Sequence, residues 1–177
     1  MNKLLFSTLF LIPLFSLSQG TGEELIYWNN SKRLTWSDYK GNADPSSSAA
    51  ASTATYLGIE YNFGKEGLTY KITCSFSKNR SWGRHKDDHI LSHEQGHFDI
   101  AEVFARKLNM KMKSYQFDKN TFKTDLKKIY QDIIDEKERT QNEYDDETNH
   151  SINKERQAEW LKKIEKMLDE YKSYSNY

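Results

Sequence analysis

The sequence predicts an α+β protein, with a small antiparallel β-sheet followed by a long helix that carries the candidate site and two further C-terminal helices. Two segments, 54–63 and 68–76, are rich in aromatic and β-branched residues and are separated by a glycine-flanked turn, which is typical of a β-hairpin. Three later segments repeat apolar residues at helical spacing. Since 177 residues suit one core of ordinary size, we expect a single domain over residues 19–177.

The three helices each have one apolar stripe. The first runs from His89 to Ser114, the second from about Thr121 into the 140s, and the third begins near Ser151 or Asn153. Because the stripes are short and separated, we expect the helices to pack on one another and on the hairpin, rather than to form a coiled coil.

Two polar segments are expected as loops. Residues 45–55 are rich in serine and alanine, although their second half could already be strand, and residues 78–88 are mostly charged. The basic residues of the second loop are followed at once by Asp87 and Asp88, and the whole chain has 26 basic against 26 acidic residues. This balance disfavours nucleic acid or an anionic membrane as a partner.

Residues 1–18 have the pattern of a signal peptide. A basic residue precedes an apolar run over 4–15, and small residues follow it. The run is too short to cross a bilayer as a helix, so we expect cleavage before Gln19 and export to the periplasm or the exterior, with a retained membrane anchor as the alternative. No later segment could span a membrane. Cys74 is the sole cysteine, so no disulfide within the chain can stabilise the exported protein.

The first helix contains His93-Glu94-Gln95-Gly96-His97, an H-E-x-x-H motif. Two imidazoles at i and i+4 lie on the same side of a helix, about 6 Å apart, so both can reach one Zn²⁺ at roughly 2.0 to 2.1 Å. Glu94 would then lie beside the open position of the metal. His89 lies one turn earlier, but three histidines spread over about 12 Å of helix axis cannot share one ion. We therefore expect His89 to be a helix residue near the rim of the site.

A helical wheel places this motif toward the core. The apolar stripe of the first helix includes Phe98 and Leu108, and Glu94 and His97 fall inside the same arc, with His93 on its edge. A buried, ionised carboxylate needs compensation, and a divalent cation is one partner that fits. The alternative is a solvated groove, or a buried polar cluster whose groups satisfy one another.

A catalytic zinc site needs a third protein ligand and leaves the fourth position for water. The wheel directs Asp99 and Glu102 away from the two histidines, so the third ligand must come from elsewhere in the chain. His150 lies in the expected break between the second and third helices, where a returning chain could present it over the first helix. The other candidates are His85, Asp145 and Asp146.

Four segments of the chain carry a wider pattern: Leu34-Thr-Trp-Ser-Asp-Tyr39, Leu91-Ser-His-Glu-Gln-Gly-His-Phe-Asp-Ile-Ala-Glu102, Tyr144-Asp-x-x-Thr-x-His150 and Gln157-x-x-Trp160. With them the sequence resembles the bacterial predicted secreted zinc-dependent proteases known as domain of unknown function 922. The resemblance implies a zincin-like fold and metallopeptidase activity, with His93, His97 and His150 as ligands and Glu94 as the catalytic residue. Ser151 departs from the glycine expected after that histidine.

We therefore expect a secreted or periplasmic zinc metallopeptidase that hydrolyses peptides or proteins through a zinc-activated water, with Glu94 as general base. Tyr144 could donate a hydrogen bond to the oxyanion, or it could pack beside the loop. An edge of the hairpin could align an extended peptide by strand addition. The alternative is a non-catalytic envelope module whose metal site is vestigial or structural, and a structural zinc would need four protein ligands, with His85 or Asp146 completing the shell.

Overall fold

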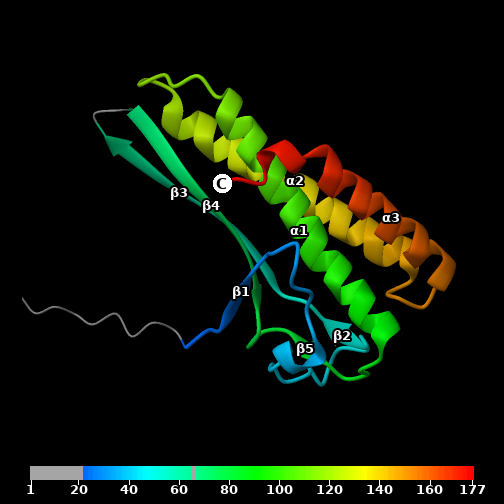
Figure 1. Ribbon diagram of the computed structural model, residues 1–177. Coiled ribbons are helices and arrows are strands. Elements are labelled where there is room, and N and C mark those ends of the chain that lie inside the picture. The colour runs from blue at the N-terminus through cyan, green and yellow to red at the C-terminus, as the bar shows by residue number, and fades with distance from the viewer. Residues whose placement is uncertain (1–21, 65–66) are drawn as a thin grey trace, which may run out of the picture.

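The computed structural model describes residues 22–64 and 67–177, and the expected signal peptide lies outside them. The described chain is α+β, as the sequence predicts: small antiparallel sheets are followed by three helices (Figure 1). In chain order the elements are β1 (Leu25–Tyr27), the 3-10 helix η1 (Trp36–Asp38), β2 (Ala51–Ser52), β3 (Thr55–Gly64), β4 (Gly67–Ser77), β5 (Trp82–Gly83), α1 (Asp88–Ser114), α2 (Phe122–Thr148), α3 (Lys154–Glu170) and the 3-10 helix η2 (Lys172–Tyr174).

The expected hairpin is confirmed as β3 and β4, which pair with Leu57 opposite Cys74. Both strands exceed the expected ranges by about a residue at the turn. β1 pairs with the other side of β4, so the three-stranded sheet has the order β1-β4-β3 and β3 is an edge strand. Burial alternates along the first part of β4, as in a half-buried strand, whereas its last four residues, Cys74 to Ser77, are all buried.

The two segments expected as loops contain a second, two-stranded sheet. Ser52 of β2 lies opposite Trp82 of β5, so the second half of the serine- and alanine-rich segment is partly strand. The backbone N–H of Arg84 donates to the carbonyl of Ala50 at 2.8 Å and extends this pairing. The small side chains of β2 allow it to lie close to the start of α1.

The helix boundaries follow ordinary capping chemistry. The side chain of Asp87 accepts the Ile90 N–H at 2.8 Å at the start of α1, and Asn153 caps α3 in the same way. α2 runs into the 140s, as predicted, and continues to Thr148 before Asn149 ends it in a left-handed conformation. The break between the second and third helices therefore begins after residue 148, and His150 lies in it, as expected.

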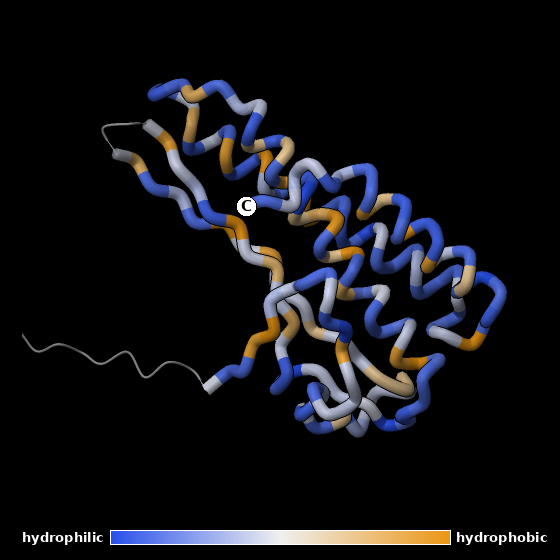
Figure 2. Tube along the Cα trace, viewed as in Figure 1, coloured by the Kyte–Doolittle hydropathy of each residue, from blue (hydrophilic) through white to orange (hydrophobic). Residues whose placement is uncertain are grey.

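α1 is the central element of the fold. It contacts the hairpin on one side and both other helices on the other (Figure 1), so it is buried nearly all the way round. Hydrophobic residues recur along α1 and the strands facing it, whereas α2 and α3 are largely hydrophilic (Figure 2). Large, fully buried apolar side chains of the core include Phe76, Phe98, Ile100, Leu108 and Ile164. Among the described residues, no helix has both the length and the apolar character needed to cross a membrane.

Candidate metal centre

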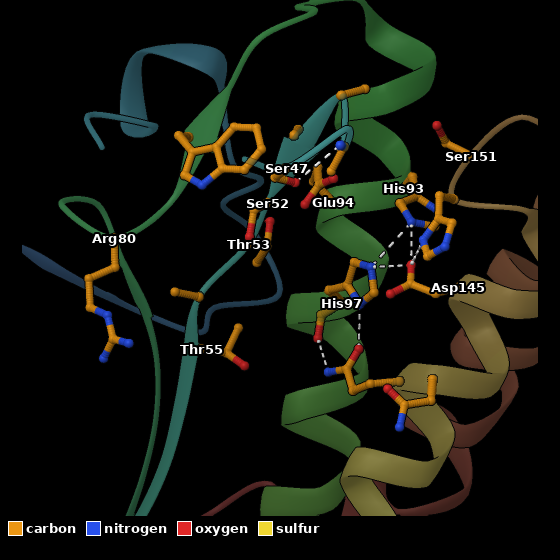
Figure 3. Close-up of a pocket in the computed structure, with 18 of the residues that line it drawn as sticks. Ser47, Ser52, Thr53, Thr55, Arg80, His93, Glu94, His97, Asp145 and Ser151 are labelled. Carbon is orange, nitrogen blue, oxygen red and sulfur yellow. Dashed lines mark hydrogen bonds and ion pairs between the residues drawn. The ribbon is translucent and has the colours of Figure 1, made fainter. Parts of the chain in front are cut away.

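A pocket of about 550 Å³ lies between the first turns of α1, the last turns of α2 and the β2 segment. His93, Glu94 and His97 all line it (Figure 3). Glu94 is 4 % exposed and His93 is 3 % exposed, so the core-facing position that the helical wheel predicts for these side chains is confirmed. The two histidines and the glutamate of the H-E-x-x-H motif thus line one cavity.

Asp145 of α2 completes a cluster with the two histidines. Its Oδ1 lies 3.0 Å from His93 Nε2 and 3.1 Å from His97 Nε2, and the two Nε2 atoms are 3.2 Å apart. In a tetrahedral zinc site with bonds of 2.0 to 2.1 Å, neighbouring ligand atoms would be about 3.3 to 3.4 Å apart. The three atoms therefore have nearly the spacing of one face of such a site.

The electrostatics of this cluster also fit a cation. Burial raises the pKa of Glu94 and lowers the pKa of His93. Burial opposes ionisation of Asp145, but the hydrogen bonds to the two histidines outweigh it and hold the Asp145 pKa well below its usual range. For His97, burial is outweighed by Asp145 and Glu94, which raise the pKa to about 8. Carboxylates held this close to imidazole nitrogens stabilise positive charge, whether a proton or a metal supplies it.

Glu94 has the position that the motif predicts. It lines the pocket beside His93 and His97, on the side of the β2 segment (Figure 3). Among the described residues its Oε2 has no hydrogen-bond partner although it is buried. Because a buried polar atom without a partner is costly, this oxygen is available to a group that enters the pocket.

The candidate third ligands lie at different distances from His93 and His97. Asp145 joins the two histidines, with all three donor atoms within 4.8 Å of one another. His150 also lines the pocket, but its side chain is 67 % exposed and its Nδ1 lies 3.6 Å from Asp145 Oδ1, beside the cluster rather than in it. His85 and Asp146 are exposed, and neither lines the pocket.

Tyr144 lies beneath the two histidines and is fully buried. Its ring stacks on His93 with a centroid distance of 4.5 Å and an angle of 22°, and its hydroxyl donates to the carbonyl of His93 at 3.3 Å. It does not line the pocket. This position matches the packing alternative for Tyr144 rather than the oxyanion role.

His89 lies near the rim, as predicted, and has a contact that the sequence does not reveal. Its Nε2 donates to the carbonyl of Ser151 at 2.7 Å. The amide of Gln157 donates to the carbonyl of His89 at 3.0 Å. The first bond holds the loop between α2 and α3 against α1, next to the pocket, and the second holds the first turn of α3 there.

The two carboxylates that the wheel directs away from the histidines do lie on other sides of α1. Asp99 accepts a hydrogen bond from Trp28 Nε1 at 2.9 Å, and Glu102 accepts one from Arg106 Nε at 2.8 Å. Both are buried and paired, so neither is available to the cluster.

The wall of the pocket opposite the helices is an extended edge. The carbonyls of Ala50 and Ala54 accept hydrogen bonds from the backbone on the β5 and β4 side. Since pairing alternates along an antiparallel strand, residues 51, 53 and 55 direct their N–H and C=O groups to the opposite edge, which lines the pocket. Farther along the same edge, at Leu57, α2 covers the strand. There the Tyr130 hydroxyl of α2 donates to the carbonyl of Leu57 at 2.7 Å.

Comparisons with known proteins agree with the sequence resemblance at the level of the family. A family model described as "Bacterial protein of unknown function (DUF922)" matches residues 18–151, which include α1 and all of α2. No curated protein and no solved structure matches the chain at a significant level.

Proposed function

The chain belongs to the DUF922 family of bacterial proteins of unknown function, and from the geometry of its pocket we propose that it is a zinc-dependent metallopeptidase. The observation that carries the proposal is the cluster of His93 Nε2, His97 Nε2 and Asp145 Oδ1, 3.0 to 3.2 Å apart, beside the buried Glu94. Two histidines and one carboxylate are a known ligand set of catalytic zinc. The proposal includes a zincin-like arrangement, in which the H-E-x-x-H helix packs beside an edge strand.

In this proposal the two histidines and Asp145 hold Zn²⁺, which when bound supplies a Lewis acid that polarises the scissile carbonyl and acidifies a water molecule. Glu94 takes a proton from the attacking water and passes it to the departing amine. Burial raises the pKa of Glu94, which makes its carboxylate a stronger base than that of an exposed glutamate. The buried Oε2, which has no partner among the described residues, is the atom that we assign to this transfer.

We propose that an extended segment of a peptide or protein is the substrate. Among the described residues, the backbone groups of residues 51, 53 and 55 that face away from β5 and β4 have no strand partner, and they run along the pocket on the side of Glu94. An extended peptide that pairs with this edge as an additional strand would lie across the cluster, because strand addition needs only backbone hydrogen bonds. As the sequence predicts an export signal, the enzyme would act in the periplasm or outside the cell.

The first test is the Glu94→Gln substitution, which keeps the size of the side chain but removes the base. We expect zinc to bind in the same stoichiometry, and peptide cleavage to fall by about 10² to 10⁴-fold. Metal content is measured by elemental analysis, and cleavage of a mixture of unstructured peptides by mass spectrometry. Glu143→Gln, an exposed position on α2 that does not line the pocket, is the matched control and should cleave as the parent does. Equal cleavage by the parent and Glu94→Gln would refute the assigned role.

The ligand set separates the enzyme from the alternative, a structural module. His150 lies 3.6 Å from Asp145 Oδ1, so a small movement could make it a fourth protein ligand and close the site. For the enzyme we expect Asp145→Ala to lose zinc affinity by at least about 10-fold, and His150→Ala to retain it. A similar loss in both variants, together with a parent that has four protein ligands by X-ray absorption spectroscopy, would instead support a structural zinc.

A further inference from the structure

The side-chain amide of Gln141 contacts two atoms of His97 at once. Gln141 Oε1 lies 2.5 Å from His97 Nδ1, and Gln141 Nε2 donates to the backbone carbonyl of His97 at 2.9 Å. Gln141 precedes Asp145 by one turn of α2, so both side chains approach α1 from the same side. Neither the H-E-x-x-H motif nor the resemblance to DUF922 assigns a role to Gln141.

The two contacts together fix where His97 carries its proton. A backbone carbonyl can only accept, so the NH₂ end of the amide must face it, and the amide oxygen must face the ring. That oxygen is itself an acceptor, and therefore His97 Nδ1 must carry a hydrogen. Nε2 is the nitrogen that faces Asp145 and His93. Because the Asp145 carboxylate also only accepts, both ring nitrogens face acceptors without a metal, and the hydrogen held on Nδ1 by Gln141 leaves Nε2 as the nitrogen that gives up its hydrogen to bind a metal.

We propose that Gln141 is a positioning residue of the metal centre, which holds His97 in the tautomer and ring orientation that a metal ligand needs. This proposal rests on the proposed metal site, but it concerns a property that the metal-free protein also has. Hydrogen bonds of this kind, from the second ring nitrogen of a ligand histidine to a nearby acceptor, fix the tautomer and increase the basicity of the ligand.

The other histidine is held in a different way, which makes the role of Gln141 specific to His97. Within the described part of the chain, His93 Nδ1 is buried and has no hydrogen-bond partner. His93 is instead oriented by its stacking on Tyr144. Loss of the Gln141 amide should therefore alter one ligand of the pair and leave the ring of the other in place.

The first measurement reads the tautomer directly, by long-range ¹H–¹⁵N NMR of the metal-free protein at a pH where the ¹⁵N shifts show the His97 ring to be neutral. We expect the His97 proton on Nδ1 in the parent and in Gln141→Glu, whose carboxylate can still accept it. In Gln141→Leu we expect a population with the proton on Nε2. A parent that carries this proton on Nε2 would overturn the proposal, whether or not the protein is an enzyme.

The second measurement is zinc affinity, by competition with a chelator. We expect Gln141→Leu to weaken it about 10- to 100-fold and Gln141→Glu to restore it. Gln131→Leu is the matched control, because Gln131 is an exposed glutamine of the same helix whose amide contacts only Asp135 among the described residues. If Gln141→Leu is folded by circular dichroism and binds zinc as tightly as the parent, Gln141 is a structural tie between helices and the proposal fails.

Discussion

Gly96 allows the aromatic ring of Tyr144 to lie directly against α1. A Cβ atom at this position would lie 2.5 Å from the Tyr144 hydroxyl oxygen and 2.9 Å from its Cζ. Because real Cβ atoms do not approach this closely, a side chain here would displace the ring, and the ring supports His93 from below. Packing of Tyr144 beneath the cluster thus requires glycine at position 96, directly before His97.

We predict that Gly96→Ala has two effects: it destabilises the protein, and it weakens zinc binding. Helix propensity alone would favour alanine by about 1 kcal/mol, but overpacking a rigid, buried site costs about 1 to 3 kcal/mol, so we expect a net loss of up to about 2 kcal/mol. Urea unfolding of the metal-free protein measures this loss. The Tyr144→Leu background, which removes the ring, should abolish the steric penalty. A variant as stable as the parent would mean that Tyr144 can move without cost.

At the scale of elements, the connection between α2 and α3 is the most constrained part of the site. Asn149, His150 and Ser151 have φ angles of 48°, 51° and 75°, so three successive residues with side chains adopt the left-handed region. Asparagine tolerates this conformation, but it costs roughly 1 kcal/mol or more at His150 and again at Ser151. The bond from His89 to the Ser151 carbonyl helps to hold this conformation, which places His150 at the pocket.

We predict that Ser151→Gly stabilises the protein by about 0.5 to 1 kcal/mol. Glycine removes the left-handed penalty of about 1 to 2 kcal/mol, and part of this gain is lost to the greater freedom of glycine in the unfolded chain. Ser151→Ala keeps the Cβ atom and the penalty, and so should show no gain. The midpoints of urea unfolding compare the three proteins without metal. Equal midpoints for the glycine and alanine variants would contradict this explanation.

Most elements could be predicted from local patterns, because a hairpin and an amphipathic helix are each encoded by neighbouring residues. The pairing of Ser52 with Trp82 could not, since these two-residue strands have no pattern of their own and depend on contacts across 30 positions. The residue at which α2 ends could not be predicted either, since polar residues continue to the point where Asn149 ends it.

Because the sequence does not give the residue at which α2 ends, it left the third ligand open. A helix through Thr148 places Gln141 and Asp145 one turn apart on the face toward α1, whereas a loop would give them no fixed direction. The spacing of these two polar residues repeats the i, i+4 spacing of His93 and His97, and this was the available signal. It becomes informative only when the helix is known to extend that far.

For the molecule as a whole, the central position of α1 means that one helix serves two separate polar sites. One side carries the histidines, and a metal there would link α1 to α2 through Asp145. Another side carries the buried carboxylate of Glu102, which accepts hydrogen bonds from Arg106 and from the Tyr177 hydroxyl. Asn109 holds the same terminal segment by donating to the carbonyl of Tyr174 at 2.8 Å.

These two sides should make independent contributions to stability. Metal binding only to the folded state stabilises it by about 2.7 kcal/mol when free zinc is 100 times the dissociation constant. The stabilisation by zinc depends only on the zinc affinity of the cluster of His93, His97 and Asp145. The hydrogen bond between Tyr177 and Glu102 involves none of these residues. Sites that share no partners contribute additively.

We therefore predict that Tyr177→Phe lowers the unfolding free energy by about 1.5 to 3 kcal/mol, because it removes a hydrogen bond to a buried, charged group, but leaves zinc affinity within twofold of the parent. Tyr174→Phe is the control, since the Tyr174 hydroxyl has no hydrogen-bond partner among the described residues, and it should change neither quantity. Urea unfolding with and without zinc gives both numbers for each variant. A tenfold loss of zinc affinity in Tyr177→Phe would show instead that α1 transmits strain from its far side to the histidines.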